Sequence, residues 1–302
     1  MNRFSRYMVI IMLVTTAGFF NSNAAAQEND AATVGDWIIT KSRVDRHLAN
    51  TLGSRELDPK LLERARAEAL EHLIRRQIVF EFVKKQCPVP DSEVTSELSI
   101  LEANLRKTDQ KIEDHLEKTG LSKEELKQEI RWRVAWQEYL DRKITDDAMK
   151  SYFDRNRRIF DGTEIRVAHI VFAKTDAEEQ IKLANQVRKE IGEGRISWDE
   201  AVKKNSIASS SKNNGGEIGW IRFRDPMPDV FSDAAFKLEQ GQISSPVETA
   251  VGVHLIKCLE IKAGTISMKD RVKPLRIHMT RFLFDRIARN HRGELDIKYA
   301  KK

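Results

Sequence analysis

Two histidines on predicted strands are the residues of this 302-residue sequence best suited to carry chemistry. His169 lies in the run Ile165–Phe172, which is rich in β-branched residues, and His254 lies in Val253–Ile261; both runs predict strands. Histidines on strands could orient hydrogen bonds around a substrate, bind a metal, or be satisfied core residues. A zinc hydrolase would need a third ligand and the usual short-spaced motif, and the sequence shows neither clearly. We therefore expect no metal and no other cofactor.

Cysteine content and charge exclude several other classes of protein. Cys87 and Cys258 are too few for a disulfide-rich scaffold and lack metal-ligand spacing, so we expect two unpaired, unreactive thiols. The chain has 52 basic and 46 acidic residues, which predicts a mixed surface. Residues 269–302 hold 11 basic and 4 acidic side chains. We interpret this segment as a solvated helix face rather than a nucleic-acid site, and expect no nucleic-acid partner.

The N-terminus has the pattern of a secretory signal peptide. Arg3 and Arg6 lead an apolar run over residues 7–20, and the small residues Ala24–Ala26 follow. The run is shorter than the ~20 residues that a membrane helix needs, and no later segment is apolar enough to span a membrane. We therefore predict a signal peptide at 1–26 and an exported protein of the periplasm or cell envelope, without a membrane span after cleavage. An uncleaved anchor is the alternative.

The predicted elements divide the remaining chain into three regions. Residues 27–161 are predicted to be mostly helical, after a short strand or an extended entry at 34–40. Helix starts are indicated by Ser42, by Asp58 with Pro59, and by the capping box of Ser122 with Glu125. Residues 263–302 are predicted to be helical again. This tail is too apolar to stand free, so we expect it to pack back against the first region.

The middle region, 164–262, interleaves strands with helices. Strands are predicted at 165–172, 244–247 and 253–261, and helices at 177–191, after Ser197, and at 229–236. Such an alternation within about 100 residues predicts a small α+β domain. The expected fold class of the whole chain is therefore α+β, with this domain inserted between helical segments.

The order and spacing of short motifs in the middle region resemble parvulin-type peptidyl-prolyl isomerases. The motifs are VAHI at 167–170, GGEIGW at 215–220, Met227-Pro228, Phe231, Ala235-Phe236, GQIS at 241–244, Pro246-Val247 and GVH at 252–254. The helical flanks resemble the SurA- and PrsA-like exported foldases. The resemblance implies an FKBP-like α/β domain beside a SurA-like chaperone module. It also implies a function, peptidyl-prolyl isomerase and folding chaperone.

The resemblance implies a role for seven side chains. His169 and His254 match the paired central histidines of the family, which fix each other's tautomers and orient hydrogen bonds around the substrate amide. Thr249 is expected to support this network by its hydroxyl. The apolar cup for the proline ring is expected from Ile218, Met227 and Phe231, with Phe236 behind it. The partners implied are unfolded or nascent exported polypeptides with Xaa–Pro bonds; the oligomeric state stays open.

One position departs from the family pattern. Parvulins usually have a cysteine or an aspartate seven residues before the first glycine of the double-glycine turn, and here that position is Ala208. Alanine supplies neither a negative field nor a hydrogen bond, so we expect reduced activity, unless a serine of the run Ser209–Ser211 substitutes in part. Two functions follow: a prolyl isomerase that is also a chaperone, or a catalytically weak parvulin-fold holdase that only binds unfolded polypeptide.

Overall fold

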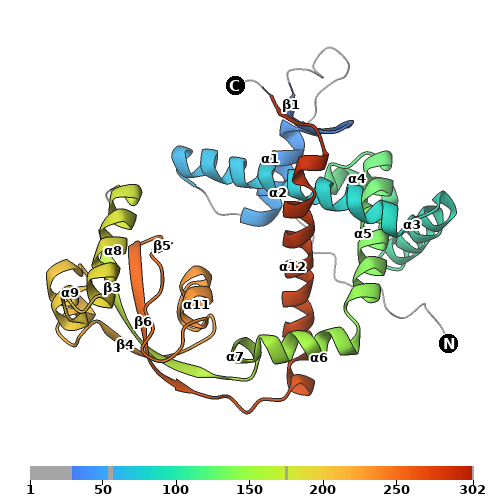
Figure 1. Ribbon diagram of the computed structural model, residues 1–302. Coiled ribbons are helices and arrows are strands. Elements are labelled where there is room, and N and C mark those ends of the chain that lie inside the picture. The colour runs from blue at the N-terminus through green and yellow to red at the C-terminus, as the bar shows by residue number, and fades with distance from the viewer. Residues whose placement is uncertain (1–28, 54–56, 174–175, 301–302) are drawn as a thin grey trace. The chain divides into compact units, whose positions relative to one another are not determined.

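The computed structural model describes residues 29–53, 57–173 and 176–300, which form two compact units (Figure 1). One unit contains the described residues up to Thr145 and those from Thr280 onward, and the other contains Asp146–Met279. The helix α12, Val272–Asn290, therefore contributes to both units. The predicted signal peptide at 1–26 lies outside the described residues.

The first unit combines helices with a small antiparallel sheet. Its helices are α1 Lys41–Leu52, α2 Pro59–Gln86, α3 Asp91–Arg106, α4 Ile112–Thr119, α5 Lys123–Lys143 and the C-terminal part of α12. The sheet has the order β2-β1-β7, with β1 Asp30–Val34, β2 Trp37–Thr40 and β7 Ile297–Tyr299. A short 3-10 turn, Arg292–Glu294, links α12 to β7. The N-terminal and C-terminal parts of the described chain thus share one sheet.

Local sequence signals explain where the long helices begin. The Asp58 carboxylate accepts hydrogen bonds from the first free amides of α2, those of Lys60 and Leu61, and Pro59 needs no hydrogen-bond partner for its nitrogen. Ser122 and Glu125 form the predicted capping box of α5, with Ser122 Oγ 3.1 Å from the Glu125 amide nitrogen. Both predicted helix starts are confirmed.

The helix α2 is buried along most of its C-terminal half, so it contributes to much of the core of the first unit. Leu73, Ile74 and Ile78 pack against β1, β2 and α1. Further along α2, Val79 and Val83 pack with residues of two other helices. These are Ala135 and Tyr139 of α5, and Ile287 and Ala288 near the end of α12. Two apolar clusters of the first unit therefore share this one helix.

The second unit is an α+β domain around a four-stranded antiparallel sheet. The strand order is β4-β3-β6-β5, with β3 Glu164–Phe172, β4 Glu217–Arg222, β5 Val247–Thr249 and β6 Gly252–Lys262. Its helices are α6 Asp146–Arg155, α7 Arg157–Phe160, α8 Ala177–Gly192, α9 Trp198–Asn205, α10 Ser209–Lys212 and α11 Asp229–Ala235, and a 3-10 turn, Met268–Arg271, precedes α12. The predicted strands at 165–172 and 253–261 are confirmed as β3 and β6.

The two faces of this sheet bury different sets of side chains. The helices α8 and α9 cover one face and α11 covers the other (Figure 1). Ala168, Ile170 and Phe172 of β3 point to the α8–α9 face, whereas Ile165 and Val167 point to the α11 face. Because side chains alternate along a strand, His169 belongs to the α11 face as well.

Several predicted elements differ from the structure near the chain ends. The single strand predicted at 34–40 is a hairpin of β1 and β2, which turns at Gly35 with a φ of 57°. Thr40, not Ser42, caps α1, since the Thr40 hydroxyl accepts from the Arg43 amide at 3.2 Å. The tail predicted to be helical ends its helix at Asn290 and forms β7 instead.

The strand predicted at 244–247 is displaced along the chain. Only Val247 belongs to β5, because Pro246 has no N–H for the ladder. Ser244 instead attaches the preceding loop to β6. Its amide donates to the Ile256 carbonyl at 2.8 Å, and its hydroxyl accepts from the Ile256 amide at 3.0 Å. The domain limits at 27–161, 164–262 and 263–302 stay predictions.

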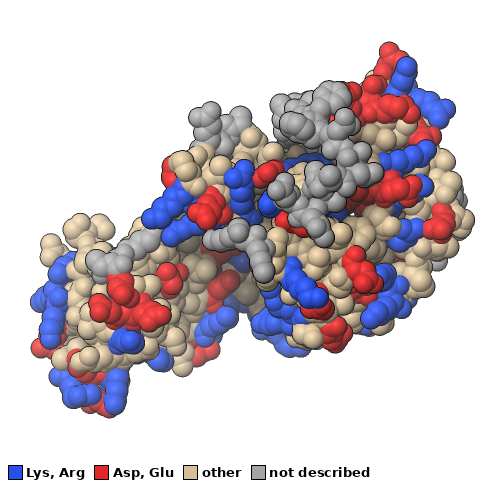
Figure 2. Space-filling view, turned by 90° about the horizontal axis from the view of Figure 1, so that it is seen from above, with Lys and Arg blue, Asp and Glu red and all other residues tan. Residues whose placement is uncertain are grey.

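The surface carries both signs of charge. Figure 2 shows basic and acidic side chains interspersed over the face in view. Cys87 and Cys258 are both free, as expected; both are also buried, and burial raises the pKa of each thiol. Within 29–53, 57–173 and 176–300, the structure has no helix whose length and hydropathy would suit a membrane crossing.

Candidate active site

The two histidines of the prediction lie side by side on the α11 face of the sheet. In the antiparallel pairing of β3 with β6, Val171 is opposite His254, two residues along from His169. The centroids of the two imidazole rings are 5.5 Å apart, with 36° between the ring planes. The sheet register therefore brings together two residues that are 85 positions apart in the sequence.

Each histidine has a hydroxyl partner at Nε2. Ser211 Oγ lies 3.1 Å from Nε2 of His169, and Thr249 Oγ1 lies 2.8 Å from Nε2 of His254. The Thr249 hydroxyl also lies 3.3 Å from the Gly252 carbonyl oxygen. Because a carbonyl oxygen can only accept, the hydroxyl donates its proton there. This assigns the donor role in the shorter contact to His254, whose Nδ1 is then unprotonated. Both Nδ1 atoms are buried without a hydrogen-bond partner.

Burial keeps both imidazoles neutral. Desolvation lowers the pKa of His169 to about 4, and desolvation together with the charge of His169 lowers the pKa of His254 to about 4. At neutral pH the site thus offers polar nitrogens and hydroxyls without a formal charge. Among the described residues, no three His, Cys, Asp or Glu side chains are grouped so that they could hold a metal ion.

Apolar side chains surround the histidine pair. Phe231 of α11 is fully buried and presents its ring edge-on to His169 and His254, with centroid distances of 6.3 and 5.6 Å. Phe236 is buried in the same cluster, while Ile218 and Met227 are only partly buried. In this structure Phe231 thus contacts the histidines, and Ile218 and Met227 reach the surface of the predicted cup.

The double-glycine turn places Ser211 beneath His169. Gly216 has a φ of 78°, and a Cβ at this position would overlap the backbone carbonyl oxygen of His169. The Gly216 carbonyl accepts from the His169 amide at 2.8 Å, and the Gly216 amide donates to the Ser211 carbonyl at 2.8 Å. The backbone thus connects β3 directly to the short helix α10, which carries the Ser211 hydroxyl.

The position with alanine in place of the usual acid or thiol lies at the start of this helix. Ala208 is the N-terminal flanking residue of α10, and its carbonyl accepts from the amides of Ser211 and Lys212. Its side chain offers no polar atom. Ser211, one helical turn further on and almost fully buried, supplies the polar group that contacts the histidine pair.

Ser211 is the one residue of this cluster that sequence analysis did not single out. The motif at 215–220 fixes the turn, but three consecutive serines precede it, and only the three-dimensional path of α10 decides which hydroxyl points inward. Ser209 and Ser210 are exposed, whereas Ser211 is buried.

Two family models match this chain. Residues 165–260 match the family described as PPIC-type PPIase domain, and residues 2–140 match the SurA-like N-terminal domain. The foldase protein PrsA of Bacillus subtilis is 30% identical over 218 residues, which cover 72% of this chain and 68% of that protein.

The chain belongs to the PrsA-like foldase family.

A second relative, foldase protein PrsA 2 of Bacillus cereus, is 27% identical over 268 residues, or 87% of this chain and 81% of that protein. A crystal structure of the PrsA peptidylprolyl isomerase from Bacillus anthracis, 22% identical, superposes with a TM-score of 0.38 and covers 74% of this chain and 96% of that one. The assignment rests on the sequence relationship alone. It confirms the resemblance to the parvulin and SurA-like families and the predicted function class, a peptidyl-prolyl isomerase and folding chaperone.

Proposed function

We propose that this PrsA-like foldase isomerises Xaa–Pro bonds of client polypeptides at the pair His169 and His254, with Ser211 acting in place of the missing acid. The observation that carries this proposal is that two adjacent imidazoles each have a hydroxyl partner, Ser211 for His169 and Thr249 for His254. Ile218 and Met227 are proposed to receive the proline ring, and Phe231 and Phe236 to support them from within.

The chemistry asked of this site is rotation about an amide bond. The barrier is ~18–20 kcal/mol because the planar amide is stabilised by resonance, and uncatalysed exchange takes tens of seconds or longer. Catalysis needs a site that binds the twisted amide better than either planar form. An apolar cup that removes water from the substrate carbonyl favours the twisted form, in which less charge is separated. No covalent intermediate is required.

The hydroxyl of Ser211 is proposed to fix the tautomer of His169. If Ser211 donates to Nε2, His169 carries its proton on Nδ1, while Nδ1 of His254 is unprotonated. Nδ1 of His169 is then a donor and Nδ1 of His254 an acceptor, each buried without a hydrogen-bond partner. Both imidazole rings are neutral at pH 7. Such preorganised polar groups stabilise a developing charge distribution without a charged side chain.

The test is exchange NMR of cis–trans interconversion in a short Xaa–Pro peptide with the full chain. We expect acceleration by the wild type and a loss of at least about tenfold in His169→Ala and in His254→Ala. Thermal stability is measured beside the rate, because a satisfied core histidine would lower only the melting temperature. Unchanged exchange in both variants would contradict the assignment of the site.

The second half of the function is binding of unfolded client polypeptides by the SurA-like region. This part is supported by the family of residues 2–140. We also propose that the protein acts after export, in the periplasm or cell envelope, and that residues 1–26 are cleaved, as their charge and hydropathy pattern indicates. Accumulation of full-length precursor in the cytoplasm of a host with a working secretion system would contradict this location.

A further inference from the structure

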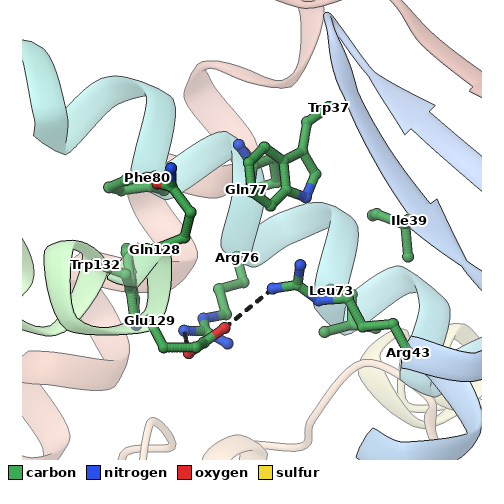
Figure 3. Close-up of a pocket in the computed structure, with 10 residues that line it drawn as sticks. All are labelled: Trp37, Ile39, Arg43, Leu73, Arg76, Gln77, Phe80, Gln128, Glu129 and Trp132. Atoms are coloured by element: carbon green, nitrogen blue, oxygen red, sulfur yellow. Dashed lines mark hydrogen bonds and ion pairs between the residues drawn. The ribbon is translucent and has the colours of Figure 1, made fainter. Parts of the chain in front are cut away.

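A groove in the first unit contains two arginines that share one carboxylate. Arg43 of α1 and Arg76 of α2 both contact Glu129 of α5, one at each carboxylate oxygen (Figure 3). Arg43 Nη2 lies 3.0 Å from Oε1 of Glu129, and Arg76 reaches Oε2. Two guanidinium groups therefore face a single negative charge, and one positive charge is left without a countercharge at this point.

Aromatic rings hold both guanidinium groups in place. Arg43 lies over the ring of Trp37 at 5.5 Å from its centroid, and Arg76 lies over Trp132 at 5.2 Å. Their side chains are only 19% and 23% exposed. Burial lowers the pKa of Arg43; Glu129 and, less strongly, Glu125 oppose this effect, whereas Arg76 and Arg46 increase it. The excess positive charge is thus fixed in position and partly removed from water, where an added anion gains most.

Apolar side chains extend from this charged centre. The groove has a volume of about 500 Å³, in the range of sites that hold a ligand of several side chains, and its apolar lining comprises Leu73, Leu101, Leu121, Leu126, Ile130 and Trp132. Two further arginines on its border already have partners: Arg46 pairs with Glu125, and Arg133 pairs with Glu97 at 3.1 Å. The unbalanced charge is therefore localised at Arg43 and Arg76.

We propose that this groove binds unfolded polypeptide at an aspartate or glutamate side chain flanked by apolar residues. The client carboxylate accepts hydrogen bonds from Arg43 and Arg76, and the flanking side chains cover the apolar lining. This inference rests on the chaperone part of the proposed function, and it names the chemical class of segment that the helical unit selects. The complementarity is specific: an apolar segment without a carboxylate would leave the second arginine without a countercharge.

The test measures binding of matched fluorescent peptides to the full chain by anisotropy. The peptides contain no proline, so that the isomerase site has no Xaa–Pro bond to bind, and they differ only in a central Glu or Gln between apolar residues. We expect the Glu peptide to bind about tenfold more tightly than the Gln peptide, and this preference to weaken with salt. Arg43→Gln and Arg76→Gln should each remove the preference.

Two further variants distinguish a binding site from a purely structural tie between helices. Glu129→Gln removes the competing carboxylate, so it should strengthen binding of the Glu peptide several-fold, whereas a structural tie predicts only lost stability. Arg64→Gln, an exposed position on α2 outside the groove, should change nothing. Equal binding of both peptides, or no gain in Glu129→Gln, would overturn the proposal. Binding of neither peptide would overturn it together with the chaperone part of the proposed function, while the proline-exchange experiment would stand unaffected.

Discussion

At the residue scale, Ser211 contacts His169 in the isomerase site, and Ala208 stands where the resemblance to parvulins implies an acid or a thiol. Ala208 carries no polar group, and Ser211 reaches His169 from one helical turn further along the chain. Ala208 immediately precedes the short helix α10, and Ser211 lies within it.

Removal of this hydroxyl should lower activity without unfolding the domain. For Ser211→Ala we expect an exchange rate about tenfold lower, because His169 loses the contact that fixes its tautomer. Ser210→Ala is the matched control, since Ser210 is an exposed neighbour on the same helix. Equal rates for the two variants in exchange NMR would refute the role of Ser211.

The histidine pair also predicts a pH dependence. Both pKa values are lowered to about 4 by burial, so the folded state favours the neutral imidazoles. The unfolded chain binds protons at these histidines below pH 6.5, their pKa in the unfolded state, whereas the folded state binds them only near pH 4. The free energy of unfolding is therefore highest above pH 6.5 and falls as the pH drops from 6.5 toward 4, by up to roughly 3 kcal/mol for each histidine.

Imidazole NMR titration measures these values directly, and midpoints near 6.5 for both rings would contradict the burial argument. The exchange rate, for the same reason, should be flat between pH 6.5 and 8, since neither ring changes its charge in that range.

The sequence alone allowed some of these residues to be predicted and others not. His169 and His254 lie in motifs whose order could be read along the chain, and Thr249 was expected from the family resemblance that these motifs carry. Ser211 could not be chosen among three serines, because the path of α10 decides which one is buried. The groove of Arg43, Arg76 and Glu129 had no local signal at all, since three separate helices bring these side chains together.

At the element scale, the turn between α10 and β4 holds the site together. Gly216→Ala should lower the free energy of unfolding by at least about 2 kcal/mol, because the new Cβ would overlap the His169 carbonyl in a left-handed conformation. Gly194→Ala has a similar φ, 71°, but open space at its Cβ, so it should cost only about 1 kcal/mol. Urea unfolding compares the two variants, and equal losses would show that steric overlap plays no part.

Three helix starts were predictable, although Ser42 was wrongly expected to cap α1, and the short strands were not predictable, for a physical reason. Asp58, Ser122 and Ser197 cap their helices through hydrogen bonds that span two or three residues, so the sequence nearby contains the whole signal. The strand β7 has three residues and exists because it pairs with β1 at the opposite end of the chain. No window of local sequence includes that partner.

At the scale of the whole molecule, the isomerase site and the groove belong to different compact units. Their functions should therefore be separable by single substitutions. His169→Ala is expected to abolish accelerated exchange and to leave binding of the proline-free Glu peptide unchanged. Glu129→Gln is expected to leave the exchange rate unchanged and to strengthen binding of the Glu peptide. Loss of both activities in either variant, with the melting temperature unchanged, would contradict two independent sites.

The central claim is that a PrsA-like foldase without the usual acid still catalyses prolyl isomerisation. The most direct measurement is exchange NMR of an Xaa–Pro peptide with the wild-type chain at pH 7, compared with Ala208→Asp. The account predicts clear acceleration by the wild type. No acceleration by the wild type, with a gain in Ala208→Asp, would contradict it and would leave a peptide-binding parvulin domain whose contribution is chaperoning.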